Sequence, residues 1–325
     1  MYGGGSARHR AGVPPHAWFV VSAVFHYLGP AFAVLLFARM DVLGVAWLRI
    51  AAAAVVFAAW RRPWRAWGSA RGLLLAWGAV LAVMNCSFYL AIDRLPLGTV
   101  AAIEFLPVIA LAAAGTRSRR NGVALLLAAG GVYVLTGIRL EAEPLGLALA
   151  FVNAVLFALY IVLAHRVAQR ADLRPVDGLA ASMLVAAVVV TPLAGWAALP
   201  ALADPLALLA GAGVGICSSV VPYVADQLAM RRLPRATYAL LVSLLPATAT
   251  AIGVIVLAQL PSARELAGVA LVVAGVALHR ENPGHAALHE GQPARARRHG
   301  AQVRHAGGDG VALRAPGARD GAWRA

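Results

Sequence analysis

Ten apolar runs, each near the length of a membrane-spanning helix, follow one another along this chain of 325 residues. A bilayer's hydrocarbon core of about 30 Å is crossed by about 20 helical residues, and short polar or Pro/Gly segments separate the runs. The predicted spans are Trp18–Ala38, Val42–Trp60, Gly72–Ile92, Leu97–Gly115, Asn121–Gly137, Leu145–Ala164, Gly178–Leu199, Leu206–Met230, Arg235–Gln259 and Glu265–Leu278. We therefore expect an all-α integral membrane protein with ten transmembrane helices.

The composition points to lipid and away from nucleic acid. Hydrophobic residues make up 61% of the chain and charged residues 13%, against about 25% charged in soluble domains. The formal charge of +14 would suit a nucleic-acid binder, but all 28 basic residues are Arg, in short gaps between apolar runs and in a polar tail. No folded polar domain carries a basic face, so we expect the lipid bilayer, and no nucleic acid, as a partner.

The two ends of the chain differ from the apolar runs. Residues 1–17 and 280–325 contain Gly, Pro, Arg, His and Ala without apolar periodicity, so both ends are predicted to be disordered. The first run is long enough to span and has no small-residue cleavage site, so it is interpreted as the first helix and not as a signal peptide.

No motif for catalysis or metal binding is present in the sequence. Cys86 and Cys217 lie inside apolar runs without a companion at metal-ligand spacing. There is no HExxH, no phosphate-binding Gly loop and no nucleophile elbow. We therefore expect no enzyme activity, no catalytic residue, no metal and no cofactor.

An internal repeat divides the chain into two halves, 18–138 and 145–279. At one constant offset, residues of the third and fourth spans recur in the eighth and ninth: Leu90, Ala91, Arg94, Leu95, Pro96, Thr99 and Ala101 match Leu228, Ala229, Arg232, Leu233, Pro234, Thr237 and Ala239. Five spans per half is an odd number, so the second half must cross the membrane in the opposite direction. This predicts two inverted five-helix repeats, an arrangement common in secondary transporters.

The distribution of Arg predicts the orientation. With the N-terminus in the cytoplasm, the predicted inner segments before the C-terminal tail carry fifteen Arg, and the outer loops carry four, Arg39, Arg94, Arg139 and Arg264. Cytoplasmic loops collect Arg and Lys. We therefore predict a multi-pass protein of the cell membrane with both termini in the cytoplasm.

Ionisable and amide side chains form a predicted polar layer inside the spans. An ionisable group near the bilayer centre costs about 2.5 to 3.5 kcal/mol, so His26, Arg49 and Glu104 need an explanation. Counting about 1.5 Å per residue from the predicted outer ends, Arg49 and Glu104 lie about 10 Å deep, and Asn85 and Asn153 about 12 Å deep. These side chains are the first candidates for a binding site.

Two interpretations of this layer remain open. In the functional one, Glu104 and Arg49 line a wet cavity and contact the amino and carboxylate groups of a zwitterionic substrate, or relay a proton. In the structural one, they form an ion pair that holds the second and fourth spans together. For His26 the alternatives are a proton relay and a hydrogen bond to a neighbouring carbonyl.

Three prolines, Pro107, Pro222 and Pro246, lie within predicted spans, where the ring and the missing N–H break or kink a helix. Such breaks are tolerated at membrane depth where protein or a wet cavity satisfies the freed carbonyls, so they indicate site-forming helices. The alternative is an ordinary packing kink. Gly211 and Gly215 form a small-residue face that is expected to pack helices. Further candidate lining residues are Tyr89, Tyr223, Ser218, Ser219 and Ser243.

Several runs resemble the EamA-type family of the drug/metabolite transporter superfamily, especially its homoserine/threonine exporter branch. They are Asn85-Cys86-Ser87-Phe88-Tyr89-Leu90-Ala91, Arg94-Leu95-Pro96-Leu97-Gly98-Thr99, Ala102-Ile103-Glu104-Phe105, Ser218-Ser219-Val220-Val221-Pro222-Tyr223, Arg232-Leu233-Pro234-Arg235-Ala236-Thr237 and Leu245-Pro246-Ala247. The resemblance implies a ten-helix exporter with a central cavity between the repeats, in which Glu104 matches the acidic residue of the fourth helix. The chain departs from the branch at Leu106, where the branch usually has Gly, and at Leu245, where some relatives carry Glu.

Taken with the residues, the resemblance predicts a secondary transporter that exports small polar metabolites by alternating access, with amino acids such as threonine or homoserine as candidate substrates. Protons as the coupling ion are a hypothesis based on Glu104, and a homodimer is a further hypothesis. The alternatives are a multidrug or metabolite uptake carrier of the same superfamily and a non-transporting membrane scaffold or sensor.

Overall fold

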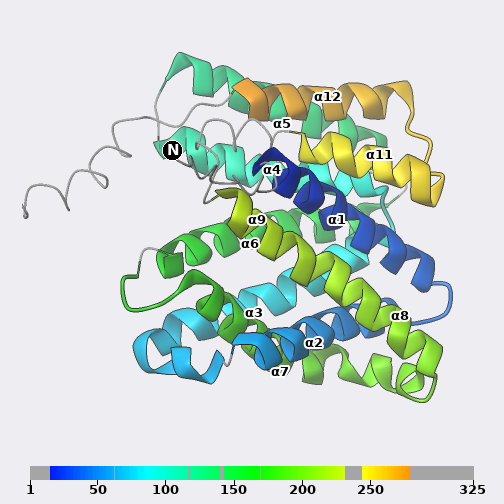
Figure 1. The fold of residues 1–325 in the computed structure, drawn as a ribbon. Coiled ribbons are helices and arrows are strands. Elements are labelled where there is room, and N and C mark those ends of the chain that lie inside the picture. Colours follow the sequence, from blue (N-terminus) through cyan, green and yellow to red (C-terminus); the bar gives the residue numbers. More distant parts are fainter. Residues whose placement is uncertain are drawn as a thin grey trace, which may run out of the picture. The chain divides into compact units, whose positions relative to one another are not determined.

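The computed structural model describes residues 15–61, 63–115, 118–139, 143–168, 170–230 and 244–278, and over these ranges the regular structure is helical (Figure 1). Ser243, residues 1–14 and residues 280–325 lie outside the described residues, whereas residues 15–17, which were predicted as part of the disordered N-terminal end, begin helix α1. The helices are α1 Pro15–Leu36, α2 Val42–Arg61, η1 Pro63–Ala66, α3 Trp67–Ile92, α4 Leu97–Gly115, α5 Arg119–Arg139, α6 Pro144–Ala168, α7 Pro175–Leu202, α8 Pro205–Gly215, η2 Ile216–Val220, α9 Val221–Met230, α11 Leu245–Leu257 and α12 Ala263–Leu278. The expected all-helical class is confirmed for this part of the chain.

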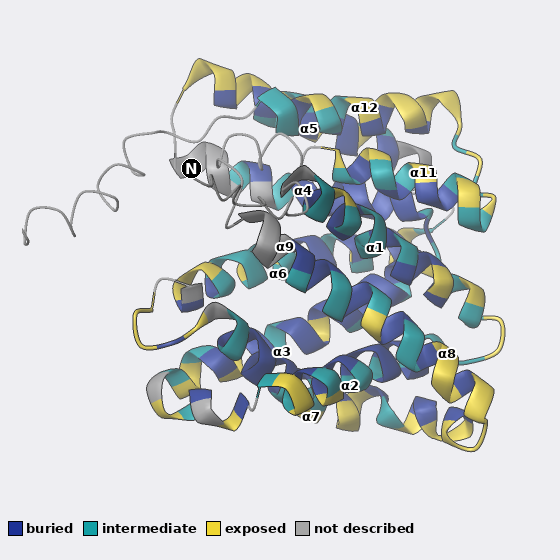
Figure 2. Ribbon diagram, in the orientation of Figure 1, coloured by how far each residue is buried: buried dark blue, intermediate teal, exposed yellow. Residues whose placement is uncertain are grey.

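Six helical stretches of the described chain are long and apolar enough to cross a membrane. Two shorter apolar helices, Leu97–Pro107 and Leu245–Leu257, fall within the predicted fourth and ninth spans. Exposed residues lie along the outer helices of the bundle (Figure 2), and many large apolar residues are among the exposed ones; Ile255, for example, is 80% exposed and Tyr133 79%. Helices that are apolar on all sides are typical of a membrane environment. The six spans are Ala17–Leu36, Val42–Arg61, Ala70–Ile92, Pro144–Val167, Val176–Leu202 and Pro205–Ala225.

Helices from the two halves of the chain pair with one another. In Figure 1, α5 lies along α12 at one side of the bundle, and α2 lies along α7 at the other. Between these pairs, α1 contacts η2, α9 and α11, whereas α3 and α4 both contact α6. The helices that carry the candidate residues other than Arg49 are thereby collected between the two outer pairs, and α2, which carries Arg49, contacts η2.

Glycines allow the backbones of these pairs to approach closely. A Cβ on Gly131 of α5 would lie 2.6 Å from the carbonyl oxygen of Gly268 of α12, and a Cβ on Gly44 of α2 would lie 2.5 Å from that of Ala197 of α7. Real Cβ atoms do not approach a neighbour within 3.0 Å. In lipid, where the hydrophobic effect does not drive helices together, such close contact is a main source of helix association.

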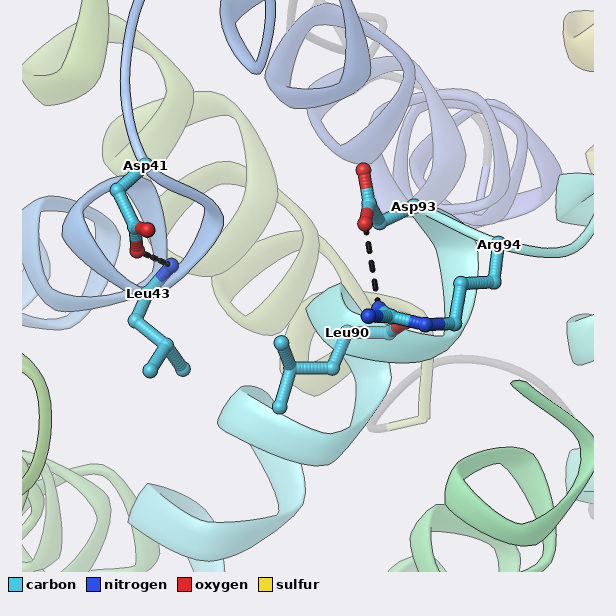
Figure 3. A network of polar contacts seen from close by, with 5 residues as sticks. All are labelled: Asp41, Leu43, Leu90, Asp93 and Arg94. Atoms are coloured by element: carbon cyan, nitrogen blue, oxygen red, sulfur yellow. Dashed lines mark hydrogen bonds and ion pairs between the residues drawn. The ribbon is translucent and has the colours of Figure 1, made fainter. Parts of the chain in front are cut away.

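Polar side chains satisfy several helix ends. Asp41 precedes α2 and its Oδ1 accepts a hydrogen bond from the N–H of Leu43 at 2.8 Å (Figure 3). Arg94 follows α3; its guanidinium donates to the carbonyl oxygen of Leu90 at 3.1 Å and contacts Asp93 at 3.2 Å (Figure 3). Terminal N–H and C=O groups have no partner within their own helix, so these contacts stabilise the ends of α2 and α3.

Two polar contacts join helix ends that are predicted, from the distribution of Arg, to lie on the cytoplasmic side. The guanidinium of Arg61, in the last turn of α2, lies 2.7 Å from Oδ1 of Asp177 in the first turn of α7. Nε of Arg120, in the first turn of α5, donates to the carbonyl oxygen of Leu278 at the end of α12 at 2.7 Å. Each pair of ends therefore lies on one side of the bundle, as antiparallel neighbours require.

Two of the three prolines predicted to break or kink a helix, Pro107 and Pro246, stand in described helices, and their role in forming a site stays a prediction. Helix α4 continues through Pro107, and Pro246 stands in the first turn of α11. A proline inside a membrane helix removes a single intrahelical hydrogen bond, which neighbouring protein groups can replace. In a first turn the proline N is not needed as a donor, so Pro246 is suited to begin α11.

Candidate functional site

Arg49 is a buried cation in the middle of α2, with 6% of its surface exposed. Its Nε donates to Oγ of Ser219 at 3.0 Å, and its Nη2 donates to the carbonyl oxygen of Ser218 at 3.2 Å. Its Cζ lies 5.3 Å from the centre of the Tyr89 ring. Neutral oxygens and an aromatic face together hold the guanidinium. Among the described residues, no carboxylate forms an ion pair with it.

The oxygen atoms that receive Arg49 belong to a distorted segment of the second half. Residues Ile216–Val220 form a π-helix, η2, in which the N–H of Val221 donates five residues back to Ile216. Pro222 follows and has no N–H for the carbonyl oxygen four residues back, that of Ser218. Pro222 lies beside this distorted segment, where its role in forming a site stays a prediction, and Arg49 binds the carbonyl oxygen of Ser218 within the segment. π-Helical turns are frequent at functional sites.

Small residues bring this segment onto the first half. A Cβ on Gly215 would lie 2.7 Å from the carbonyl oxygen of Arg49, and one on Gly211 would lie 2.5 Å from Cδ1 of Leu48. A Cβ on Gly29 of α1 would lie 2.2 Å from Oγ of Ser218. The expected packing role of the Gly211 and Gly215 face is confirmed, and that packing positions the Arg49 backbone beside η2.

Glu104 is a buried carboxylate on α4, also with 6% of its surface exposed. Its Oε1 accepts a hydrogen bond from Nδ2 of Asn153 on α6 at 3.0 Å. The ion pair of the structural interpretation is not formed, since Arg49 is directed to Ser218 and Ser219 of η2 and Glu104 to Asn153. The Coulomb field of Arg49 nevertheless reaches both Glu104 and His26, so the three predicted ionisable groups share one electrostatic neighbourhood.

Three buried polar atoms around these residues have no hydrogen-bond partner among the described residues: Oη of Tyr89, Oδ1 of Asn153 and Oγ of Ser218. Leaving such an atom unsatisfied costs about 1–3 kcal/mol. Their positions beside Arg49 and Glu104 favour a site that takes up water or a polar ligand. Asn85 differs from these residues, because its Nδ2 donates to the carbonyl oxygen of Leu81 in its own helix at 2.7 Å. This hydrogen bond does not direct the Asn85 side chain toward Glu104.

A series of aromatic rings adjoins the polar groups. His26 lies 6.3 Å from Tyr223 between ring centres, Tyr223 lies 6.4 Å from Tyr160, and Tyr160 lies 6.0 Å from Phe157. Phe157 in turn lies 6.2 Å from Phe105, the residue after Glu104. The sequence interpretation missed Phe105, Phe157 and Tyr160. The spacing of three between Phe157 and Tyr160, which puts both on one face of α6, was the available signal.

Comparison with known proteins identifies the family. Residues 144–280 match the EamA-like transporter family. Over 251 residues the chain is 31% identical to the threonine/homoserine exporter RhtA of Escherichia coli K12, a match that covers 76% of this chain and 84% of that protein. This chain belongs to the EamA-like transporter family. It is also 30% identical over 251 residues to RhtA of Salmonella typhimurium SL1344, so within the EamA-like family it falls in the RhtA-like branch.

A solved crystal structure shares the fold. It matches with a TM-score of 0.51 at 19% sequence identity and covers 81% of this chain and 97% of that chain. As an EamA-like protein of the RhtA-like branch, the chain is a multi-pass membrane exporter that moves a small molecule, and it is not an enzyme. The resemblance drawn from the sequence is confirmed.

The EamA-like match at residues 144–280 covers α6 to α12. It therefore includes Asn153, Ser218 and Ser219, which bind the two charged residues, whereas Arg49 and Glu104 lie before it in the chain. The candidate site of this EamA-like protein joins charges from the first half to neutral partners from the second.

Proposed function

We propose that this exporter moves small polar amino acids, such as threonine or homoserine, out of the cytoplasm. It does so by alternating access between two inverted five-helix repeats, residues 18–138 and 145–279, with both termini in the cytoplasm. The names of the RhtA relatives from two bacteria support this substrate class.

The observation that carries the proposal is that Arg49 and Glu104 are both buried, lie in one electrostatic neighbourhood and are not bound to each other. An amino acid presents a carboxylate and an ammonium group, which complement the guanidinium of Arg49 and the carboxylate of Glu104. Charge-assisted hydrogen bonds are about twice as strong as neutral ones. A substrate carboxylate would therefore replace the neutral Ser218 and Ser219 oxygens with a net gain.

The substrate hydroxyl has candidate partners in the same place. Oη of Tyr89 and Oδ1 of Asn153 are buried and lack a partner among the described residues. If a buried polar group of a site is paired only when the correct ligand is bound, an analogue without the matching group leaves it unpaired. Such a site therefore binds the analogue more weakly. Threonine and homoserine carry a hydroxyl that would satisfy such a group, which supports them over purely aliphatic amino acids.

The helix pairing supports the inverted repeats. If the two halves of the chain are related by a two-fold axis, each contact in one half has an equivalent in the other. The contact of α3 with α6 is then equivalent to the contact of α9 with α1, and the contact of α4 with α6 is equivalent to the contact of α11 with α1. The pairs α2 with α7 and α5 with α12 map onto themselves. A pseudo-two-fold axis in the membrane plane produces this pattern.

Glu104 is the proposed proton acceptor that couples export to the proton gradient, because it is a buried carboxylate beside the proposed substrate ammonium. Protonation of Glu104 would release that ammonium. The homodimer expected from the sequence stays a prediction, to be checked by cross-linking in native membranes.

The series of aromatic rings from His26 to Phe105 favours a second candidate, an exporter of aromatic or apolar compounds. Stacked rings bind flat or apolar molecules through dispersion and cation–π contacts. The same substrate assay separates the two candidates.

The proposal is tested by efflux of labelled threonine, homoserine and phenylalanine from expressing cells, with and without a collapsed proton gradient. Threonine and homoserine should leave faster than from cells with an empty vector, and collapse of the gradient should slow them. Efflux of phenylalanine alone would support the second candidate. Tags at the two termini should be reached by antibody only after the membrane is permeabilised.

A further inference from the structure

A cavity lies away from the candidate site, where α4 begins, α11 ends and α12 begins. It has a volume of about 230 Å³, and its walls include Pro96, Thr99, Thr250, Gln259, Glu265 and Val269. Glu104 lies seven residues further along α4 than Leu97, which is about 10 Å along the helix axis. The cavity is therefore above the candidate site, at the end of the bundle that the Arg distribution places outside the cell.

A hydrogen bond between the two halves of the chain closes one side of this cavity. Oε1 of Gln259 accepts from the N–H of Leu97, the first residue of α4, at 3.1 Å. The first N–H groups of a helix have no acceptor within the helix, so Leu97 requires an outside partner. Gln259 comes from the second half, 162 residues later, and its side chain amide supplies that partner.

The end of α11 directs Gln259 toward α4. Helix α11 ends at Leu257, and Ala258 adopts a left-handed conformation with φ of 52°. The N–H groups of Ala258 and Gln259 both donate to the carbonyl oxygen of Gly253, which turns the chain sharply. A left-handed alanine costs about 1–2 kcal/mol, so the surrounding contacts must hold this turn in place.

Close packing of α4 on α11 forms the floor of the cavity. A Cβ on Gly98 would lie 2.3 Å from Oγ1 of Thr250 and 3.1 Å from its Cα. Oγ1 of Thr250 donates to the carbonyl oxygen of Pro246 at 2.9 Å, and its lone pairs face away from that bond. Any residue larger than glycine at position 98 would push the two helices apart at this end.

The walls of the cavity suit a small polar molecule. Thr99 and Thr250 contribute hydroxyl groups, Gln259 contributes an amide, and Pro96 and Val269 contribute apolar surface. Glu265 fixes the far wall, because its Oε2 accepts from the N–H and Oγ of Ser262 at 2.8 and 3.0 Å. The volume is below the range of about 300–1,000 Å³ of pockets for drug-sized ligands, so a molecule of amino-acid size fits better than a drug.

We propose that this cavity is the exit-side binding site for the transported amino acid, and that the hydrogen bond from Leu97 to Gln259 is the latch that holds α4 against the end of α11 beside it. This inference rests on the proposed function, because it takes the substrate and the outward direction from it. In the arrangement described here α4 and α11 are in contact. Release would require that contact and the latch to open together.

Matched substitutions at Gln259 test the latch in the full-length protein. Gln259→Met removes the acceptor oxygen at nearly constant length, whereas Gln259→Glu keeps an acceptor. The parent carries Cys86→Ala and Cys217→Ala, which replace both native thiols, and Val269→Cys reports on the cavity wall. A membrane-impermeant methanethiosulfonate is added outside intact cells, and its rate of reaction with Val269→Cys is measured. The rate should be about threefold higher when Gln259→Met is also present than in the parent, which is the factor expected for the loss of one average interhelical hydrogen bond in lipid.

Gln259→Glu, which keeps an acceptor oxygen for the N–H of Leu97, should label more slowly than Gln259→Met. Gly98→Ala should separate the same helices without changing the latch atoms, so it should also increase labelling. This variant takes the place of Gln259→Met if Gln259→Met fails to reach the membrane. Saturating external threonine should slow the labelling of the opened variants. Equal labelling of the parent and both opened variants would overturn the latch, and labelling that threonine leaves unchanged would overturn the binding site.

Threonine efflux from the same cells separates this inference from the proposed function. Normal efflux with no change in labelling would reject the latch and leave the export proposal standing. Labelling from the cytoplasmic side only, measured in inside-out vesicles, would overturn both the outer position of the cavity and the proposed orientation.

Discussion

The guanidinium of Arg49 donates a hydrogen bond at 3.2 Å to the carbonyl oxygen of Ser218, the carbonyl that lies four residues before Pro222. Because proline has no N–H, Pro222 cannot donate to this oxygen as it would in α-helical register, and Arg49 from the first half supplies a donor. A substrate carboxylate that draws Arg49 away from Ser218 would remove that donor. Binding at Arg49 is thereby linked to the shape of η2.

The first prediction concerns this link. Pro222→Ala returns an N–H that competes with Arg49 for the carbonyl oxygen of Ser218, so efflux should fall by about tenfold, the effect of about 1.4 kcal/mol. Pro192→Ala is the control, because Pro192 also lies inside a helix, α7, but is exposed. Efflux should be unchanged in the control, and an equal loss in both variants would mean that the effect is not specific to Ser218.

The second prediction separates charge from geometry at Arg49. Arg49→Lys keeps the positive charge. An ammonium lacks the planar fork of a guanidinium, so Lys cannot donate to Ser218 and Ser219 and contact the Tyr89 ring at the same time. Arg49→Ala removes both and should lower threonine efflux more than Arg49→Lys does. Initial rates at several internal threonine concentrations check this. Full activity of Arg49→Ala would exclude a role in substrate binding.

The third prediction tests Glu104 as the coupling group. Glu104→Gln keeps an acceptor for Nδ2 of Asn153 but cannot ionise. It should lower efflux at least as much as Arg49→Ala and should abolish the dependence on the proton gradient. The measurement is labelled threonine efflux with and without an uncoupler. Unaltered, gradient-dependent efflux in Glu104→Gln would remove Glu104 from the mechanism.

The fourth prediction concerns Asn153, which is fully buried against Glu104. Asn153→Asp places a second carboxylate beside the first, and two adjacent carboxylates in a buried site cannot both ionise readily. It should impair gradient-dependent efflux more than Asn153→Ala, which merely removes the hydrogen-bond donor. The same efflux assay compares them, and a more active Asp variant would contradict the proposed arrangement.

The fifth prediction uses two neighbouring glycines of α5. A Cβ on Gly131 would meet the carbonyl oxygen of Gly268 at 2.6 Å, whereas one on Gly130 would meet nothing within 4 Å. Gly131→Ala should destabilise the protein by about 1–3 kcal/mol through overpacking. Gly130→Ala should be neutral or stabilise it by up to about 1 kcal/mol, because alanine is the better helix former. Thermal unfolding of the purified protein in detergent measures both.

Much of the fold and some of the site could be predicted from the sequence, because they depend on local patterns. The predicted apolar runs begin and end within a few residues of helices such as α2 and α6. His26, Arg49 and Glu104 stand out in a sequence because charge is costly in lipid wherever it lies along a span. The small residues at Gly211 and Gly215 likewise follow a four-residue spacing that is visible without a structure.

The partners of the charged residues could not be predicted this way. Depth along a span suggested that Arg49 and Glu104 would meet, but depth does not fix which way a side chain points around its helix. Packing through Gly215 turns Arg49 toward Ser218 and Ser219, and it leaves Glu104 with Asn153. The burial of Glu265 was missed for the same reason, although Ser262 and Glu265 carry a recognisable capping-box spacing.

The sequence by itself determined that this chain is a bundle of apolar helices with a few charges held at membrane depth, because hydropathy and charge are properties of each segment alone. Tertiary structure decided which neutral groups those charges meet, because Arg49 and Ser218 lie 169 residues apart and meet only through the packing of α2 on α8 and η2. Helix packing in lipid is governed by the fit of small residues and by hydrogen bonds between helices, and neither can be read from one segment.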